Sequence, residues 1–445
     1  MSETFQKKSL IQLTWPIFIE LTLFMLMGMV DTFMLSAYSD NAVAAVGMSN
    51  QVINLIGVMF NFVAAGTIIL VSQNLGANNQ TKASEVSIVS IGANLVIGLL
   101  LSLVMVTCSK YILSFMNTPQ EIMQTTISYT QIVGSFLFLM AVQPVLSGIL
   151  RSFGYTKQSM IITLIANIIN IFGNAIFIYG LFGVPELGPI GVAISTVFSR
   201  FVTIVLISLV IYKKINFTFS ENFFKKLPLQ DVKNILRIGV PSALEQVAYS
   251  SSQVIIISFV SIIGTLAITT RVYTSNISMF IYLFSLAIAQ GNQVLVGYFI
   301  GEGNNDEVYK RTFKTQLLAV SVSVSMSIIF YFISDYLFGI FTADATILTL
   351  GKSLLFINIL LEIGRASNLV LTNALKAAGD INYPFIFGVV GMWLICIPVA
   401  YILGIELGLG LAGIWIAFAV DECFRGIIFT FRWKGKKWIN KSFIS

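Results

Sequence analysis

The chain has 445 residues, of which 56% are hydrophobic and only 10% are charged, whereas about a quarter of the residues in typical soluble domains are charged. Long apolar runs recur from one end to the other, which excludes a soluble globular fold. The formal net charge of +6 does not indicate a nucleic-acid partner, because the lysines and arginines are gathered in particular loops between the apolar runs.

Twelve apolar segments, each long enough to cross a membrane as a helix, follow one another along the chain. Each crossing of a bilayer core of about 30 Å requires about 20 helical residues. The predicted spans are residues 10–37, 44–75, 84–108, 120–150, 158–181, 189–212, 236–262, 267–300, 312–333, 346–375, 382–404 and 409–432. The first span follows Lys7 and Lys8 and lacks a small-residue cleavage site, so we expect it to be retained.

The distribution of positive charge predicts the orientation of the spans. The loops after every second span, together with both ends of the chain, carry nearly all of the lysines and arginines. Under the positive-inside rule, these loops and both termini face the cytoplasm. We therefore expect a multi-pass protein of the cell membrane with both termini in the cytoplasm.

The chain also contains an internal repeat with an offset of 225 residues. Pro16 and Glu20 in the first span match Pro241 and Glu245 in the seventh. Further matches pair Ala64, Gly66, Leu70, Val71, Gly76, Asn79, Tyr111, Leu150, Arg151 and Gly154 with Ala289, Gly291, Leu295, Val296, Gly301, Asn304, Tyr336, Leu375, Lys376 and Gly379. Repeats of six spans are inserted in the same direction, which predicts two lobes related by an axis along the bilayer normal and facing a central cleft.

The repeat divides the chain into three predicted parts. Residues 1–212 form an N-terminal six-helix lobe, and residues 235–445 form a C-terminal six-helix lobe with a basic cytoplasmic tail. Residues 213–234 form a polar, basic cytoplasmic connector. The lysines of this connector are explained either by ordinary positive-inside charge or by binding to anionic lipid.

No motif points to an enzyme or to a bound cofactor. The sequence has no histidine and no nucleotide-binding loop of the P-loop type, which leaves no His-based catalytic site. Cys108, Cys396 and Cys423 lie inside apolar runs without metal or redox spacing, so we expect no disulfide. A membrane-embedded enzyme and a passive channel are the alternatives to a transporter.

Polar residues within the predicted spans are the candidate site, because charge in a bilayer is costly without a partner, a proton or water. Glu20 and Asp31 are eleven residues apart, close to three helical turns, and so share one helix face. Asn167, Asn170 and Asn174 follow at i, i+3 and i+7 in the fifth span. These groups either orient an ion or a proton or hold helices together.

The C-terminal lobe has different chemistry. It keeps Glu245 but has Ile256 at the position of Asp31. Its other intramembrane charges are Glu362 and Arg365 in the tenth span and Asp421, Glu422 and Arg425 in the twelfth. Spacings of one turn permit structural ion pairs, or carboxylates that exchange an arginine for an ion or a proton during a cycle.

Several motifs in this order resemble the multidrug and toxic compound extrusion (MATE) family. They are Trp15-Pro16, Val30-Asp31-Thr32, the segment 72–76, the segment 148–154, the asparagines of the fifth span and the segment 373–380. The resemblance implies two six-helix bundles, alternating access, and exchange of drug-like cations against protons or sodium ions. It also sets the asparagine face near Asp31, with Thr196 completing a polar cluster. Asp31, Asn170 and Asn174 are then candidate ligands of a sodium ion. In many members, however, the position of Asn174 is acidic.

The expected function is therefore secondary active antiport. Small amphipathic or cationic compounds are exported in exchange for protons or sodium ions, with no cofactor and with membrane lipids as the only other partners of a monomer. A lipid-linked precursor flippase of the same broad superfamily is the alternative. The sequence leaves the choice between proton and sodium open.

Overall fold

The computed structural model describes residues 9–221, 223 and 228–444, so Lys7 and Lys8 and part of the predicted connector lie outside the described residues. The described residues contain helices and no strand. The first half comprises α2 (Leu10–Ser36), α3 (Asp40–Gly76), α4 (Gln80–Phe115), α5 (Gln120–Ser135), α6 (Leu137–Ser152), α7 (Thr156–Tyr179), the short 3₁₀ helix η1 (Leu181–Gly183) and α8 (Pro189–Lys214).

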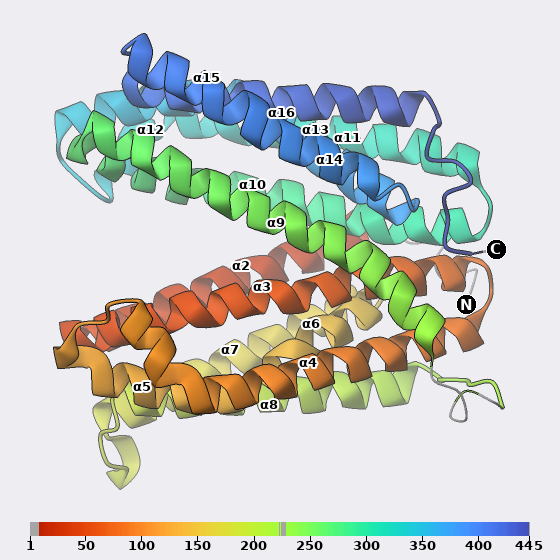
Figure 1. Cartoon of the computed structure of the whole chain (residues 1–445), viewed down its shortest axis with the longest axis horizontal. Coiled ribbons are helices and arrows are strands. Elements are labelled where there is room, and N and C mark those ends of the chain that lie inside the picture. Colours follow the sequence, from red (N-terminus) through yellow and green to blue (C-terminus); the bar gives the residue numbers. More distant parts are fainter. Residues whose placement is uncertain (1–8, 222, 224–227, 445) are drawn as a thin grey trace. The chain divides into compact units, whose positions relative to one another are not determined.

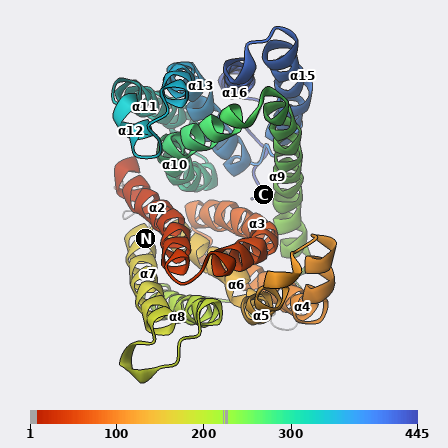
Figure 2. The same cartoon turned by 90° about the vertical axis from the view of Figure 1, so that its left-hand side faces the viewer.

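The second half repeats this order with small changes. It comprises α9 (Leu229–Ile263), α10 (Thr265–Gly301), α11 (Asn305–Phe332), α12 (Ser334–Gly339), α13 (Ala345–Ala377), α14 (Asn382–Val390), η3 (Gly391–Cys396), α15 (Ile397–Tyr401), η4 (Ile402–Glu406) and α16 (Gly410–Lys434). Within each half the long helices run along one another (Figures 1 and 2). The short helix α12 had no counterpart among the predicted elements.

The prediction of twelve spans in two six-helix bundles is confirmed. Among the described residues, ten helical segments are long and apolar enough to cross a membrane, and α5 with α6 forms an eleventh that bends by 47°. The twelfth, α16, is more polar because it carries Asp421, Glu422 and Arg425. The predicted span 120–150 was continuous, but the structure breaks it at Phe136, which separates α5 from α6.

The span from Asn382 to Glu406 is irregular around Pro398. Six residues before it (η3) and five residues after it (η4) wind as π-helix. Proline cannot donate to the helical hydrogen-bond ladder, and π-turns are a common way for a helix to absorb such a defect. Pro398 therefore lies in a locally rewound helix.

The described chain forms two compact units. The first consists of Ile19–Leu75 and Asn79–Gly239, and the second of the described residues up to Phe18, of Gly76–Asn78 and of the chain from Val240 onward. Helix α2 thus belongs to the second unit for its first turns and to the first unit thereafter, and α9 is divided in the opposite sense at Val240.

The repeat is visible in local geometry. Asn79 caps α4 by accepting from the backbone N–H of Lys82, and Asn304 caps α11 by accepting from that of Glu307. Gly154 and Gly379, at the ends of α6 and α13, both have the positive φ that favours glycine, at 79° and 91°. Equivalent residues therefore end and begin equivalent helices.

The connector packs on the start of α4 in the first unit. Lys82 Nζ lies 2.9 Å from Asp231 Oδ2, and Glu85 Oε1 accepts hydrogen bonds from the backbone N–H and the hydroxyl of Ser220. Ile215 is only 3% exposed. The described part of the connector is thus held by specific contacts.

Candidate functional site

A buried chain of polar side chains in the first unit begins at Asp31, near the end of α2. Asn174 of α7 donates from Nδ2 to Asp31 Oδ1 at 2.6 Å and approaches Asn170 Oδ1 at 3.4 Å. Asn170 donates from Nδ2 to Thr196 Oγ1 of α8 at 3.4 Å. Both asparagine side chains are fully buried. The structure therefore brings together four of the residues predicted for the N-terminal lobe.

Two residues that were not predicted join this chain. Tyr129 of α5, which is 3% exposed, hydrogen-bonds with Thr196. Arg200 of α8, one turn after Thr196, is close enough to interact electrostatically with both Asp31 and Tyr129. Asp31 is the one carboxylate that the described residues place in this cluster, and the guanidinium of Arg200 is near enough to attract its charge.

The signal for Arg200 was present in the sequence. An arginine in the middle of the apolar run 189–212 is costly unless it has a partner, and that cost marks a functional or structural site. Tyr129 gave no comparable signal, because a tyrosine in an apolar helix is ordinary packing. Its role appears only when α5 and α8 pack together.

The predicted stripe of Glu20 and Asp31 on α2 is divided between two clusters. Glu20 Oε1 lies 3.0 Å from Arg151 Nη2 of α6 and accepts a hydrogen bond from Ser159 of α7 at 3.1 Å. Asn167 also has a separate partner, since its Nδ2 donates to the backbone carbonyl of Leu23 at 2.8 Å. Glu20 thus links α2 to α6 and α7, and Asn167 links α7 to α2, but neither joins the series of side chains that begins at Asp31.

The second unit contains the counterpart of the Glu20 pair. Glu245 Oε2 of α9 lies 2.6 Å from Lys376 Nζ at the end of α13. Glu245 therefore forms an ion pair at the end of α13, as Glu20 does at the end of α6.

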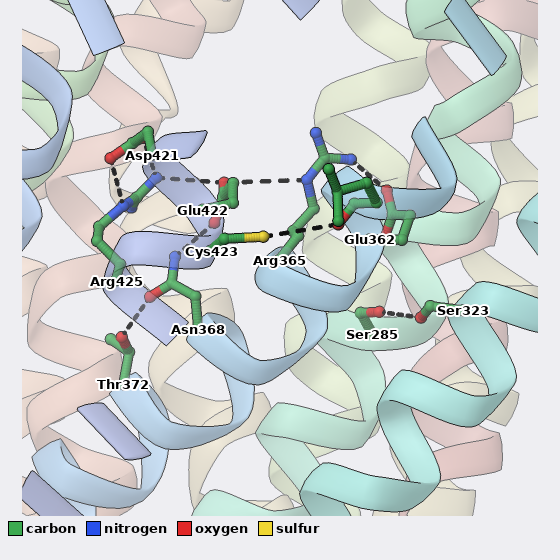
Figure 3. Close-up of polar contacts among 11 residues, drawn as sticks. Ser285, Ser323, Glu362, Arg365, Asn368, Thr372, Asp421, Glu422, Cys423 and Arg425 are labelled. Atoms are coloured by element: carbon green, nitrogen blue, oxygen red, sulfur yellow. Dashed lines mark hydrogen bonds and ion pairs between the residues drawn. The ribbon is translucent and has the colours of Figure 1, made fainter. Parts of the chain in front are cut away.

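The other charged residues predicted as candidate site residues of the second unit form one continuous ladder (Figure 3). Arg365 Nη1 lies 2.6 Å from Glu362 Oε1, and Arg365 Nε lies 3.9 Å from Glu422 Oε1. Glu422 Oε1 is 3.2 Å from Arg425 Nη2, which is 2.6 Å from Asp421 Oδ2. The two pairs predicted within α13 and within α16 are thus linked across these helices by Glu422.

Two residues that sequence reasoning missed extend the ladder along α13. Asn368 donates from Nδ2 to Glu422 Oε2 at 2.7 Å, and Thr372 donates to Asn368 Oδ1 at 3.0 Å. Both are drawn in Figure 3 below Glu422. Their spacing from Arg365, at i+3 and i+7, put them on the same helix face and was the available signal.

The two clusters are suited to binding and releasing positive charge. Buried carboxylates and amides inside a membrane span serve as sites for protons, ions or cationic ligands. Two bundles of six spans with such groups enclosed in each are the architecture of a membrane transporter. The fold and these clusters define that class of protein.

Comparison with known proteins specifies the family. The MatE family model matches residues 16–176 and again residues 241–402. The chain therefore belongs to the MATE family of transporters, which are transport proteins for small molecules and not enzymes. The twofold match also agrees with the internal repeat.

Individual relatives cover almost the whole chain. It is 44% identical over 433 residues to the "Uncharacterized transporter YisQ" of Bacillus subtilis (strain 168), covering 97% of this chain and 95% of that protein. It is 28% identical over 439 residues to the "Probable multidrug resistance protein NorM" of Thermotoga maritima, covering 99% and 94%. A crystal structure of MATE in complex with MaD3S has the same fold, with a TM-score of 0.87, 21% identity, and coverage of 96% and 95%.

Proposed function

We propose that this MATE transporter is an antiporter that exports small amphipathic or cationic compounds from the cell in exchange for protons or sodium ions. The observation that carries the proposal is the chain from Asp31 through Asn174 and Asn170 to Thr196, enclosed by apolar helices of a single unit. A titratable carboxylate with fixed amide partners is a group whose charge can change during a cycle. Membership of a family that contains proteins named for multidrug resistance supports the substrate class.

The groups available as ligands around Asp31 favour the proton over sodium as the coupling ion. Sodium was predicted to bind Asp31, Asn170 and Asn174. Arg200 already supplies one positive charge beside the single carboxylate of the cluster among the described residues, and position 174 is an amide. Either ion adds one positive charge beside the guanidinium, but a sodium ion also needs space and several oxygen ligands, whereas a proton on Asp31 adds no bulk and needs no further oxygen ligands.

In the proposed cycle, protonation of Asp31 removes the negative charge that attracts Arg200 and Asn174. The contacts of α2 with α7 and α8 then change strength, which biases the packing of the first unit. A change of this kind shifts an equilibrium between two access states only to the extent that the two states bind the proton differently. Substrate binding and proton binding thereby become coupled and alternating access follows, with the protein acting as a monomer in its lipid bilayer.

The test is transport by the purified protein in proteoliposomes, with pH and sodium gradients imposed separately and ethidium as the probe. We expect a pH gradient to drive ethidium accumulation, and D31N to abolish that coupling. D40N, at the exposed start of α3, is the matched control and should behave as the wild type. Coupling that survives D31N shows the site assignment to be wrong, and accumulation driven only by sodium reverses the choice of ion.

The alternative of a lipid-linked precursor flippase predicts several unpaired cations that receive an anionic headgroup. Arg151, Lys376, Arg365 and Arg425 are instead each ion-paired with a carboxylate. This arrangement supports cation export over flipping of an anionic headgroup.

A further inference from the structure

Arg271, near the start of α10, is the one arginine of the second unit that has no ion pair among the described residues. Each of the other four contacts a carboxylate, and they are Arg311, Arg365, Arg425 and Arg432. Arg271 instead donates from Nη2 to Gln253 Oε1 of α9 at 3.0 Å, and the titratable group near enough to interact with it is the Tyr249 phenol. Because a positive charge within a membrane span is costly without a counter-charge, this guanidinium is expected to receive an anionic partner.

The side chain of Arg271 extends away from the turn at Gly264 that joins α9 to α10. Arg271 lies six residues along α10 from that turn, which is about 9 Å, and its partner Gln253 lies ten residues back along α9, which is about 15 Å. A long cationic side chain that only escapes the bilayer extends toward the nearer membrane surface. Arg271 extends toward the interior of the spans, which indicates a polar environment there.

Polar side chains form a stripe on each of these two helices. The stripe of α9 occupies one helix face, at i, i+3, i+4 and i+7, and consists of Gln246, Tyr249, Ser250 and Gln253. The stripe of α10, at i, i+4, i+7 and i+11, consists of Arg271, Ser275, Ser278 and Tyr282. The hydrogen bond from Arg271 to Gln253 joins the two stripes, and Tyr282 is close enough to Tyr249 to interact with it. The two stripes therefore face each other.

These polar groups are partly uncovered and keep unused hydrogen-bonding capacity. Tyr249 is 46% exposed, Ser250 and Ser275 are exposed, and α9 is the least buried of the candidate spans in the described chain. Within the residues that the structure describes, the hydroxyls of Tyr249 and Tyr282 make no hydrogen bond, and neither does the amide nitrogen of Gln253. Groups of this kind are available to a ligand.

The chemistry of the available groups selects an anion. The oxygen of Gln253 is occupied by Arg271, so the amide offers its N–H groups, and the Tyr249 phenol adds an O–H. An arginine fork donates two parallel hydrogen bonds to a carboxylate or to a sulfonate, which share this geometry. The rings of Tyr249 and Tyr282, with the exposed Met279 one turn after Ser275, supply aromatic and adaptable apolar surface beside the charge.

The first half of the chain lacks this arrangement. The positions 225 residues before Gln253 and Arg271 hold Gly28 and Val46, neither of which has a polar side chain. The ion pair that ties the first helix to the end of the fourth span, by contrast, exists in both halves. A contact that a six-helix unit needs in order to fold is expected in both copies. The restriction of Arg271 and Gln253 to one copy favours ligand binding over a structural role.

We propose that the facing stripes of α9 and α10 bind the acidic group of an aromatic substrate, with the guanidinium of Arg271 as its counter-charge. Gln253 holds the guanidinium and adds an N–H donor, and Tyr249 adds a hydroxyl beside the ring of the substrate. The substrates then include aromatic acids as well as the cationic compounds proposed above. One unpaired guanidinium suits a single small acidic group and not the several charges of a lipid-linked headgroup. The inference rests on the proposed export function and extends its substrate class.

Two dyes with the same xanthene core and opposite charge provide the test. Fluorescein carries a carboxylate and is an anion at neutral pH, whereas rhodamine 123 is a cation. Fluorescence polarisation of each dye with the purified full-length protein in detergent gives two values of Kd. The Kd for rhodamine 123 divided by the Kd for fluorescein measures the preference for the acid.

The preference is compared in wild type, R271Q, R271K and Y249F. K352Q is the matched control, because it also removes one positive charge. Lys352 lies seven residues from the start of α13, much as Arg271 lies six from the start of α10, but its ammonium pairs with Asp335 at exposed positions.

The preference for fluorescein should fall at least tenfold in R271Q and severalfold in R271K and Y249F, because lysine keeps the charge without the fork. K352Q should equal wild type. Equal decreases in R271Q and K352Q overturn the site, as does a preference that none of the variants weakens. If R271Q does not fold, R271K and Y249F decide. A wild type that binds rhodamine 123 but not fluorescein contradicts this inference alone, whereas absence of dye binding together with absence of ethidium exchange contradicts the proposed function as well.

Discussion

Glu20 and Arg151 form an ion pair at 3.0 Å across 131 residues of sequence, and the residues at their repeat-related positions do the same. Glu245 and Lys376, also 131 residues apart, pair at 2.6 Å. The charge of each partner is the same in both halves, whereas the basic residue is arginine in the first half and lysine in the second. An ion pair that ties the first helix of each half to the end of its fourth span is therefore a shared part of both units.

Removal of one partner of the first pair should destabilise the protein. In E20A the guanidinium of Arg151 loses a buried counter-charge, and breaking a buried pair in this way costs about 3–5 kcal/mol. In R151K the pair is kept, as it is with lysine at position 376. Thermal unfolding in detergent should show a large decrease in Tm for E20A and a small one for R151K. Equal decreases in the two variants contradict the pairing argument.

The electrostatic interaction of Arg200 with Asp31 should appear in a double-mutant cycle. R200Q leaves Asp31 without its counter-charge and D31N leaves Arg200 without its own, whereas the double variant removes both charges. We expect the double variant to be less destabilised than the sum of the single variants, with a coupling energy of about 1–3 kcal/mol. Additive effects on the free energy of unfolding indicate that the two charges do not interact.

Restoring an acidic residue at position 174 should change the ion preference of the first cluster. Asn174 Nδ2 lies 2.6 Å from Asp31 Oδ1, so N174D places two carboxylates side by side and gives the cluster an excess negative charge. A ligand that binds only the folded state raises Tm with its concentration. Sodium chloride should therefore raise the Tm of N174D more than that of wild type. Potassium chloride at the same ionic strength serves as the control, and an equal response to both salts counts against the prediction.

The C-terminal tail should contribute to the stability of the second unit. Trp438 is 0% exposed, stacks on Trp433 at 4.4 Å between ring centroids, and donates to the backbone carbonyl of Trp433. Truncation of a fully buried tryptophan costs about 3–5 kcal/mol. W438A should unfold at a clearly lower temperature than F431A, whose ring is 69% exposed. Similar Tm values for the two variants show that the tail does not stabilise the unit.

The spans and the duplication were predictable because hydropathy and repeated Gly, Pro and Glu positions depend on local sequence. Helical spacing also placed Asn170 and Asn174 on one face. The family resemblance set that face near Asp31. Spacing cannot say which neighbouring helix a face meets, so the partners of Asp31 on α8 and of Glu20 on α6 emerged only from packing. The joint retention of an acid and a base at positions 20 and 151 and again at 245 and 376 was an unused signal for the ion pairs.

The bend between α5 and α6 was also missed by the sequence analysis. Gly134 and Ser135 directly precede Phe136, but there is no proline at the break and the segment as a whole is apolar, so hydropathy alone does not reveal the bend. The ladder of the second unit was predicted only as two separate pairs, because the contact of Glu422 with both arginines joins different helices. Local rules thus predicted the elements and proposed candidate site residues, and tertiary contacts decided which charges share a cluster.

The division of α2 has a consequence for biosynthesis. Its opening turns belong to the second unit, where Trp15 and Phe18 contact Phe284 of α10. Those turns are translated before the rest of the described helices, and their packing partner follows more than 260 residues later. The opening turns of α2 therefore reach their final packing environment only after α10 has been inserted, so the second unit is completed with a segment that was translated long before the rest of it.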